Sequence, residues 1–153
     1  MIKTIKQWEA TAMLASTKQF VQALEQKEIR YTDQGTTEGG KDMIAVTYGG
    51  DNMSSIRVQF FFDEDGENVA LRVFDIVKVS DDKVARILTA VNEQNARFRF
   101  AKFVLDVRDN TVQAEIDASF RSHDVGDICL EALQCMVGIC DDAYPELMKA
   151  MWA

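Results

Sequence analysis

Hydrophobic residues follow a helical spacing at the start of the chain and a strand-like alternation after it. Apolar positions recur every three or four residues across 10–27, which places them on one face of a predicted helix. Strict alternation over 56–62 and 69–79 predicts two neighbouring strands, each with one buried face. Shorter strands are expected at 29–32 and 43–48. The helix stripe consists of Met13, Leu14, Thr17, Phe20, Val21 and Leu24.

The second half of the chain places two more helices around a pair of strands. Ser80 is a suitable N-cap for a helix over 81–95, and Asp124 is a suitable N-cap for a long amphipathic helix near the C-terminus. We expect Pro145 to kink or restart that last helix, because proline removes a backbone hydrogen bond. The buried stripe expected for the helix over 81–95 is Val84, Ile87, Leu88 and Val91.

Residues 101–120 carry a hairpin pattern, in which two alternating runs flank Asp109 and Asn110. A two-residue loop would place Arg108 opposite Thr111 and would bring Lys102 opposite Asp117 as a favourable charge pair. The expected apolar pairs are Val107 with Val112, Leu105 with Ala114 and Phe103 with Ile116. The pattern predicts an antiparallel sheet.

The register between the strands over 56–62 and 69–79 stays open from the pattern alone. Their apolar faces coincide only if the connecting loop holds an even number of residues. A four-residue loop, Asp63 to Gly66, would set Arg57 opposite Arg72, an unfavourable pair, and a six-residue loop avoids it.

Length and composition favour one α+β domain over 1–153, with a twisted antiparallel sheet flanked by helices. The chain has 153 residues, 47% hydrophobic and 27% charged, with a single proline. A domain of this size buries roughly 68–70% of the surface of its unfolded chain. No linker, repeat or low-complexity segment divides the sequence, so a second domain is not expected.

Charge and cysteine content indicate where such a chain works. The formal net charge of -8 repels nucleic acid and anionic membranes, so neither is expected as a partner. The N-terminus lacks the unbroken apolar run of a secretory signal. Three cysteines, Cys129, Cys135 and Cys140, suit reduced thiols better than a disulfide framework, which favours a cytoplasmic protein.

One segment resembles a phosphate-binding loop. Gly35 to Lys41 reads G-x-x-x-x-G-K, but Asp42 replaces the serine or threonine that would hold magnesium. A strand is expected after it, whereas the motif needs a helix N-terminus. We therefore interpret Gly35 to Asp42 as a loop between strands, and keep a small-molecule or nucleotide site there as the alternative function.

Other candidate chemistry has simpler explanations. The acidic residues near Gly66 lack the bidentate glutamate of a calcium loop and suit a turn. His123 has no second histidine or suitably spaced cysteine, and Asp124 and Asp127 beside it suit a helix start. The cysteines lack C-x-x-C spacing, and Cys129 and Cys140 fall on an apolar stripe. We expect no catalytic residue, no metal and no cofactor.

A few apolar residues stand where the pattern expects polar ones. Phe61, Phe74 and Ile76, together with Ala70, fall on the sheet face opposite the main core set. Such a patch must be covered by a helix of the same chain or by another protein. Trp8 lies off the stripe of the first helix, so it is either a further contact residue or is buried under the sheet.

The segment that begins at Asn92, N-E-Q-N-A-R-F-R-F-A-K-F-V-L-D, resembles the YbjN family of bacterial sensory transduction regulators. The ending A-Y-P-E-L-M at 143–148 is similar to the tail of that family, whereas Gln94 departs from an aromatic residue common there. The matching positions are Asn92, Asn95, Arg99, Phe100, Ala101, Lys102 and Asp106.

The resemblance implies a fold like that of type III secretion chaperones, often dimeric, and it supplies no catalytic residues. It agrees with a non-enzymatic regulatory or chaperone-like module, expected as a homodimer, that binds a protein or peptide. The expected contact residues are Trp8, Phe61, Phe74 and Ile76. Asn92 and Asn95 are expected to cap the helix end or to bond the following loop into the hairpin.

Overall fold

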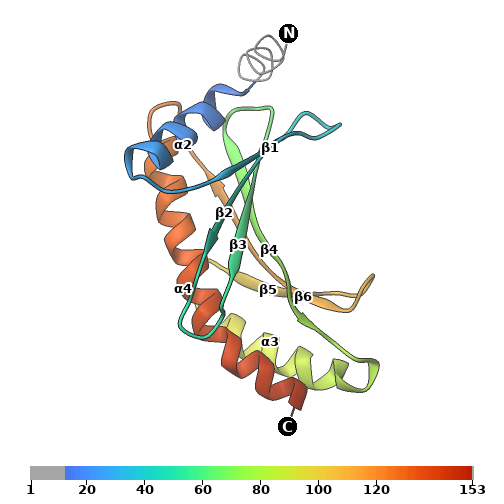
Figure 1. The fold of residues 1–153 in the computed structure, drawn as a ribbon. Helices are drawn as coiled ribbons and strands as arrows, with labels where there is room; N and C mark the ends of the chain where they lie inside the picture. The colour runs from blue at the N-terminus through green and yellow to red at the C-terminus, as the bar shows by residue number, and fades with distance from the viewer. Residues whose placement is uncertain (1–12, 153) are drawn as a thin grey trace.

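The computed structural model describes residues 13–152, and Figure 1 shows their arrangement. A short 3-10 turn, Asp81–Lys83, leads into α3. The six strands form one antiparallel sheet in the order β1-β2-β3-β4-β6-β5, which confirms the predicted α+β class. In chain order the elements are α2 (Ala15–Gln26), β1 (Thr32–Thr36), β2 (Asp42–Tyr48), β3 (Ile56–Phe62), β4 (Asn68–Lys78), α3 (Val84–Arg97), β5 (Lys102–Asp106), β6 (Thr111–Ser119) and α4 (Val125–Trp152).

The helix α4 runs along one face of the sheet, with α2 near its beginning and α3 near its end (Figure 1). It packs against β3, β4 and β6 and also contacts both other helices. Gly126 allows α2 to come close, since a Cβ at this position would meet the Ala23 Cβ at 3.0 Å. We call the face toward α4 the inner face and the opposite one the outer face.

Aromatic side chains fill the inner face beneath α2. Phe20 of α2 lies 4.4 Å from Phe60 and 5.6 Å from Phe62, measured between ring centroids. Phe120 follows at 6.3 Å from Phe62. All four rings are buried, and they bring together segments from opposite ends of the chain. Burial of each such side chain contributes about 1.5–3 kcal/mol.

The β3–β4 register selects the six-residue loop. Phe62 lies opposite Val69 and Gln59 lies opposite Arg72. Gln59 therefore takes the position opposite Arg72 that the four-residue loop would have given to Arg57, and the two arginines do not face each other. The observed pairing therefore avoids the repulsion between two arginines that the four-residue loop would have caused.

The predicted pairing within the β5–β6 hairpin is wrong by two residues. Asp106, rather than Arg108, lies opposite Thr111, and Lys102 lies opposite Glu115 instead of Asp117. The turn is therefore longer, and Val107 within it is 79% exposed. The Asp106 carboxylate accepts hydrogen bonds from the Arg108 backbone, Nε and Nη2 at 3.0, 3.0 and 2.8 Å. A shift of two residues keeps the side chains that remain in β5 and β6 on their predicted faces, whereas Val107 leaves the strand for the turn.

Two further elements differ from the predicted ones. The first strand is Thr32–Thr36, displaced from 29–32 into the polar segment, and all its residues are exposed. An exposed edge strand has no apolar alternation to reveal it. In α3 the buried residues are Ile87, Ala90, Val91 and Gln94, whereas Leu88 is 49% exposed. The apolar residues of α3 fit either of two neighbouring stripes on the helix surface. The position of α4 decides which of the two stripes is buried.

The helix α4 continues through Pro145 instead of ending or restarting there. Proline has no N–H, so the carbonyl of Asp141, four residues earlier, loses its helical partner. The Asn52 side-chain amide donates to that carbonyl at 3.0 Å. The loop between β2 and β3 thus compensates for the proline. No helix within residues 13–152 has both the length and the apolar content that a membrane crossing requires.

Candidate functional site on the outer face of the sheet

The outer face is built from residues that alternate with the core residues of β2, β3, β4 and β6. Their pairing places Met43, Phe61, Ala70 and Asp117 in one row across four strands. The first three are partly exposed and Asp117 is exposed. In the part of the chain that the structure describes, no helix therefore buries this face, and it can reach a partner.

Phe61 and Phe74 meet at the centre of the outer face. Their ring centroids are 6.4 Å apart and their planes are inclined by 74°, an edge-to-face arrangement. Phe74 remains 41% exposed. The sequence predicted that both rings share this face, and the structure brings them into contact. Aromatic side chains that pack against each other while still open to solvent are typical of protein contact sites.

Ile76 does not belong to this surface, which corrects the predicted set. It is 7% exposed and belongs to the buried core. The cause is a bulge: Val73 lies opposite Ala114 and Val77 opposite Val112, so three residues of β4 face a single residue of β6. Asp75 within the bulge has φ of 54°. Simple alternation cannot anticipate such an insertion. Trp8 lies outside the described residues.

Charges of both signs border the aromatic pair. Arg72 donates from Nη1 to Asp117 Oδ1 at 2.9 Å, and its Nη2 lies 3.6 Å from Glu115 Oε1. This cross-strand network joins β4 to β6. Val104 of β5, 40% exposed, adds an apolar position toward the other edge. Val104 was not among the predicted contact residues, although it interrupts the polar face of its strand as Phe61 and Phe74 interrupt theirs.

The segment that resembles a phosphate loop forms the β1–β2 hairpin. A strand follows Lys41, as predicted, and the Lys41 ammonium lies 3.1 Å from the Asp63 carboxylate. The buried Asp42 carboxylate accepts hydrogen bonds from the Leu14 N–H, the Thr17 hydroxyl and the Thr36 hydroxyl at 2.8, 2.7 and 2.8 Å. Its oxygens hold the start of α2 against β2. The arrangement offers no helix N-terminus to phosphate.

The remaining candidates show no catalytic arrangement. His123 is exposed in the turn before α4, and residues 13–152 contain no cluster of three or more potential metal ligands. Cys129 and Cys140 are buried, as predicted, and burial raises the pKa of each thiol to about 12. A thiol with that pKa is a poor nucleophile at neutral pH. Asp65 accepts the Glu67 and Asn68 backbone N–H groups, which explains the acidic residues by a tight turn.

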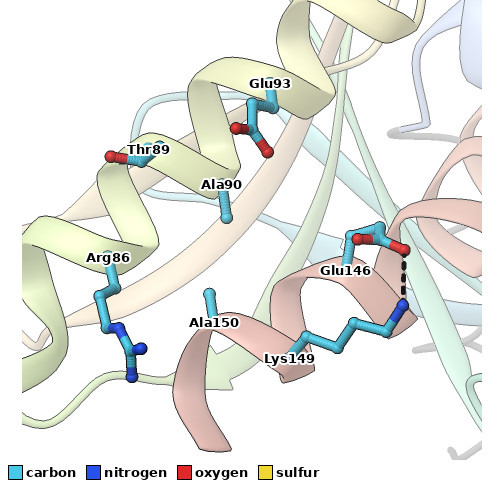
Figure 2. Close-up of a pocket in the computed structure, with 7 residues that line it drawn as sticks. All are labelled: Arg86, Thr89, Ala90, Glu93, Glu146, Lys149 and Ala150. Atoms are coloured by element: carbon cyan, nitrogen blue, oxygen red, sulfur yellow. Dashed lines mark hydrogen bonds and ion pairs between the residues drawn. The ribbon is translucent and has the colours of Figure 1, made fainter. Parts of the chain in front are cut away.

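A shallow groove of about 350 Å³ separates α3 from the end of α4 (Figure 2). Ala90 and Ala150 line it, between charged residues of both signs. Figure 2 shows the Glu146–Lys149 ion pair along one wall, with an Oε1 to Nζ distance of 3.2 Å. Its polar side chains are exposed or partly exposed, and the Thr89 hydroxyl donates to the Ala85 carbonyl at 3.2 Å, so the groove suggests no reaction.

The matched motif residues build the junction between α3 and β5. The Asn95 side chain accepts from the Phe103 N–H at 2.7 Å and donates to the Phe103 carbonyl at 3.0 Å. Lys102 donates to the carbonyls of Asn95 and Phe98 at 2.8 and 3.0 Å. The predicted role of Asn95 in bonding the loop into the hairpin is confirmed. Asn92 is exposed on α3.

Comparison with known proteins agrees with this architecture. The crystal structure of YbjN from E. coli, described as a putative transcription regulator, superposes with a TM-score of 0.54 at 10% identity, covering 83% of this chain and 90% of the other. At that identity the likeness shows the fold alone. No curated protein matches the sequence. The family model of YbjN, described as a putative bacterial sensory transduction regulator, matches residues 17–149. The chain belongs to the YbjN family.

Proposed function

We propose that this protein is a regulator without catalytic activity that works by binding another protein through the outer face of its sheet. The Phe61–Phe74 pair is the observation that carries the proposal, because Phe74 stays 41% exposed beside its partner ring. Exposed aromatic clusters on monomers commonly mark contact sites. The family description as a sensory transduction regulator supports a regulatory role.

The shape of the face favours a macromolecular partner. Cofactor and substrate sites are concave and mostly enclosed, whereas these side chains stand on the surface of a sheet. Apolar Met43 and Val104 extend the aromatic pair on both sides, with Arg72 and its acidic partners among them. A central apolar patch bordered by charged groups is the usual composition of a protein interface.

A second copy of the chain is the partner we propose first. A two-fold interface brings the same patch of both copies together, so the patch must complement itself. The outer face carries Arg57 and Arg72 on β3 and β4, and Glu115 and Asp117 on β6. A two-fold axis near Phe74 would place basic strands of one copy against the acidic strand of the other. The proposed assembly is a homodimer.

The substitution Phe74→Asp tests the proposal. We expect the wild-type protein to have twice the mass of the chain by light scattering at tens of micromolar, and the variant to have the mass of one chain. Leu88→Asp is the matched control, because Leu88 is also a large exposed apolar residue but lies on α3. That control should keep the wild-type mass. Far-UV circular dichroism verifies that both variants are folded.

Affinity capture separates self-association from binding of a different protein. The wild-type protein could instead be a monomer that captures other proteins, which Phe74→Asp loses and Leu88→Asp keeps. That result would mean that the partner at the outer face is a different protein and not a second copy of the chain. A monomer whose captured proteins are unchanged by Phe74→Asp would contradict the use of the outer face altogether.

A further inference from the structure

An apolar pocket of about 290 Å³ lies between β6 and α4. Ile116 of β6 forms one wall, and Ile128, Ala132 and Cys135 of α4 form the other. The three α4 residues stand one helical turn apart on a single face and are only partly buried. This volume lies at the lower limit of sites for drug-sized ligands, about 300 Å³, and it leaves ample space for one aliphatic side chain.

Phe100 stands at the rim of the pocket in a strained backbone conformation. Its φ is 75°, and the Ala101 N–H donates to the Arg99 carbonyl at 3.0 Å, which closes a γ-turn around Phe100. This turn type is rare and strained for a bulky residue. The ring is nevertheless 71% exposed, so its burial does not offset the strain. Strain of this kind concentrates at functional sites.

The same turn leaves part of the sheet open beside the pocket. Pairing between β5 and β6 stops at Lys102 and Glu115, whereas β6 continues to Ser119, so 116–119 border only β4. The Phe120 N–H donates to the Glu67 carbonyl, so the even-numbered residues of β6 bond to β4. In an antiparallel ladder the alternate residues face the other way. Asp117 therefore directs its backbone N–H and C=O toward the open side.

We propose that this open edge and its pocket bind an extended, basic peptide segment of a partner protein. The segment would pair with β6 at Asp117 and place one aliphatic side chain in the pocket. Glu131 supplies a carboxylate at the opening, and the chain has a net charge of -8, so flanking lysine or arginine residues complement the site. An edge that offers backbone hydrogen bonds next to a side-chain pocket favours a peptide over a small molecule.

A short synthetic peptide tests the proposal in the full chain. The probe is acetylated and amidated Arg-Thr-Leu-Thr-Arg, followed by nuclear magnetic resonance of the backbone amides. We expect shifts at 116–119 and at Ile128 and Cys135. Replacing leucine by alanine should weaken binding about fiftyfold, because three buried carbons are removed. Replacing both arginines by glutamate should weaken binding by at least about tenfold.

N-methylation of both threonines isolates the backbone contribution. It leaves the side chains in place but removes the N–H groups that would pair with β6, so binding should be lost. The amine 4-methylpentylamine carries a similar apolar group and a positive charge without a peptide backbone. Equal binding by this amine or by the N-methylated peptide would overturn the proposal of strand pairing.

Charge reversal on the protein supplies a second, independent test. Glu131→Lys should weaken the basic peptide and strengthen its glutamate analogue, whereas Glu93→Lys, the same charge reversal at an exposed position of α3, should change neither. Iodoacetamide should modify Cys135 before the two buried cysteines, and bound peptide should slow that reaction in proportion to the occupied fraction. Absence of amide shifts at millimolar peptide, or unchanged preference in Glu131→Lys, would refute the site.

This site and the proposed outer-face interface share Asp117 of β6, but the substitutions that test them lie at different residues. Phe74→Asp alters the outer face and should leave peptide binding at the β6 edge unchanged. Glu131→Lys alters the β6 edge and should leave the mass of the assembly unchanged. The two proposals can therefore fail separately.

Discussion

Glu28 ends α2 in a backbone conformation that glycine adopts more readily. Its φ is 57°, and the Ile29 N–H donates to the Leu24 carbonyl at 2.9 Å. This is the six-to-one bond of a Schellman motif, with the left-handed residue just after the helix. The side chain is exposed. Nothing observed at this position requires glutamate, and the conformation is costly for any residue with a Cβ.

We therefore expect Glu28→Gly to raise the free energy of unfolding by about 0.5–1 kcal/mol, because relief of the strained φ exceeds the added freedom of the unfolded chain. Gln22→Gly, at an exposed position inside α2, should lower it by about 0.5–1 kcal/mol. Urea denaturation measures both. Destabilisation by both substitutions would mean that Glu28 is not strained.

Single residues also show what the sequence could predict. Phe61 and Phe74 were identified because each interrupts a polar phase, a signal that depends only on neighbours in the chain. Ile76 was misplaced because the bulge at Asp75 depends on how β4 meets β6. The positive φ of Phe100 was not predicted, since it is set by a turn that no composition rule indicates. Patterns among neighbouring residues can be predicted from the sequence, whereas bulges and turns that depend on packing between strands cannot.

At the scale of elements, Asn95 joins the end of α3 to the start of β5. Its side-chain amide makes two hydrogen bonds to the backbone of Phe103, one as acceptor and one as donor. Lys102 adds bonds to the carbonyl of Asn95 in the last turn of the helix and to that of Phe98 just after it. Together they fix the direction in which the chain leaves α3, which sets the position of Phe100 at the rim of the β6 pocket.

Replacing Asn95 by alanine should lower the free energy of unfolding by about 1–3 kcal/mol, because the Phe103 N–H and carbonyl lose their partners. Asn92→Ala, on the exposed side of the same helix, should change it by less than about 0.5 kcal/mol. Thermal and urea denaturation give both values. Equal effects from the two asparagines would contradict a specific role for Asn95.

In the β5–β6 hairpin, the sequence predicts which side chains face the core better than it predicts which residues lie opposite each other. The alternation of β5 and β6 fixes which side chains face the core, and that prediction is right. The register depends on the turn, and Asp106 draws Arg108 into a longer loop through three hydrogen bonds. The pKa of Asp106 falls to about 2, mainly because of the Arg108 side chain. A two-residue turn signal could not reveal that competing interaction.

At the scale of the whole molecule, α4 is the element on which the others converge. It contacts α2, α3 and three strands. Its Asp141 carboxylate also accepts the backbone N–H groups of Asp51, Asn52 and Met53 at 3.0, 2.8 and 2.9 Å. Gly50 is required beside it, since a Cβ there would collide with the carboxylate. The loop between β2 and β3 is thus fixed to a helix almost a hundred positions later.

This link predicts how stability depends on pH. The Met53 N–H, and then that of Asn52, lowers the pKa of Asp141 below its ordinary value of 3.8. A lowered folded-state pKa stabilises the fold above the unfolded pKa, and the benefit is lost as pH falls through the folded pKa. Asp141→Asn should therefore lower the urea midpoint near about pH 7 more than near about pH 3. Asp142→Asn, its exposed neighbour, should change neither midpoint. An equal loss at both pH values would show that Asp141 acts by shape alone, independently of its charge.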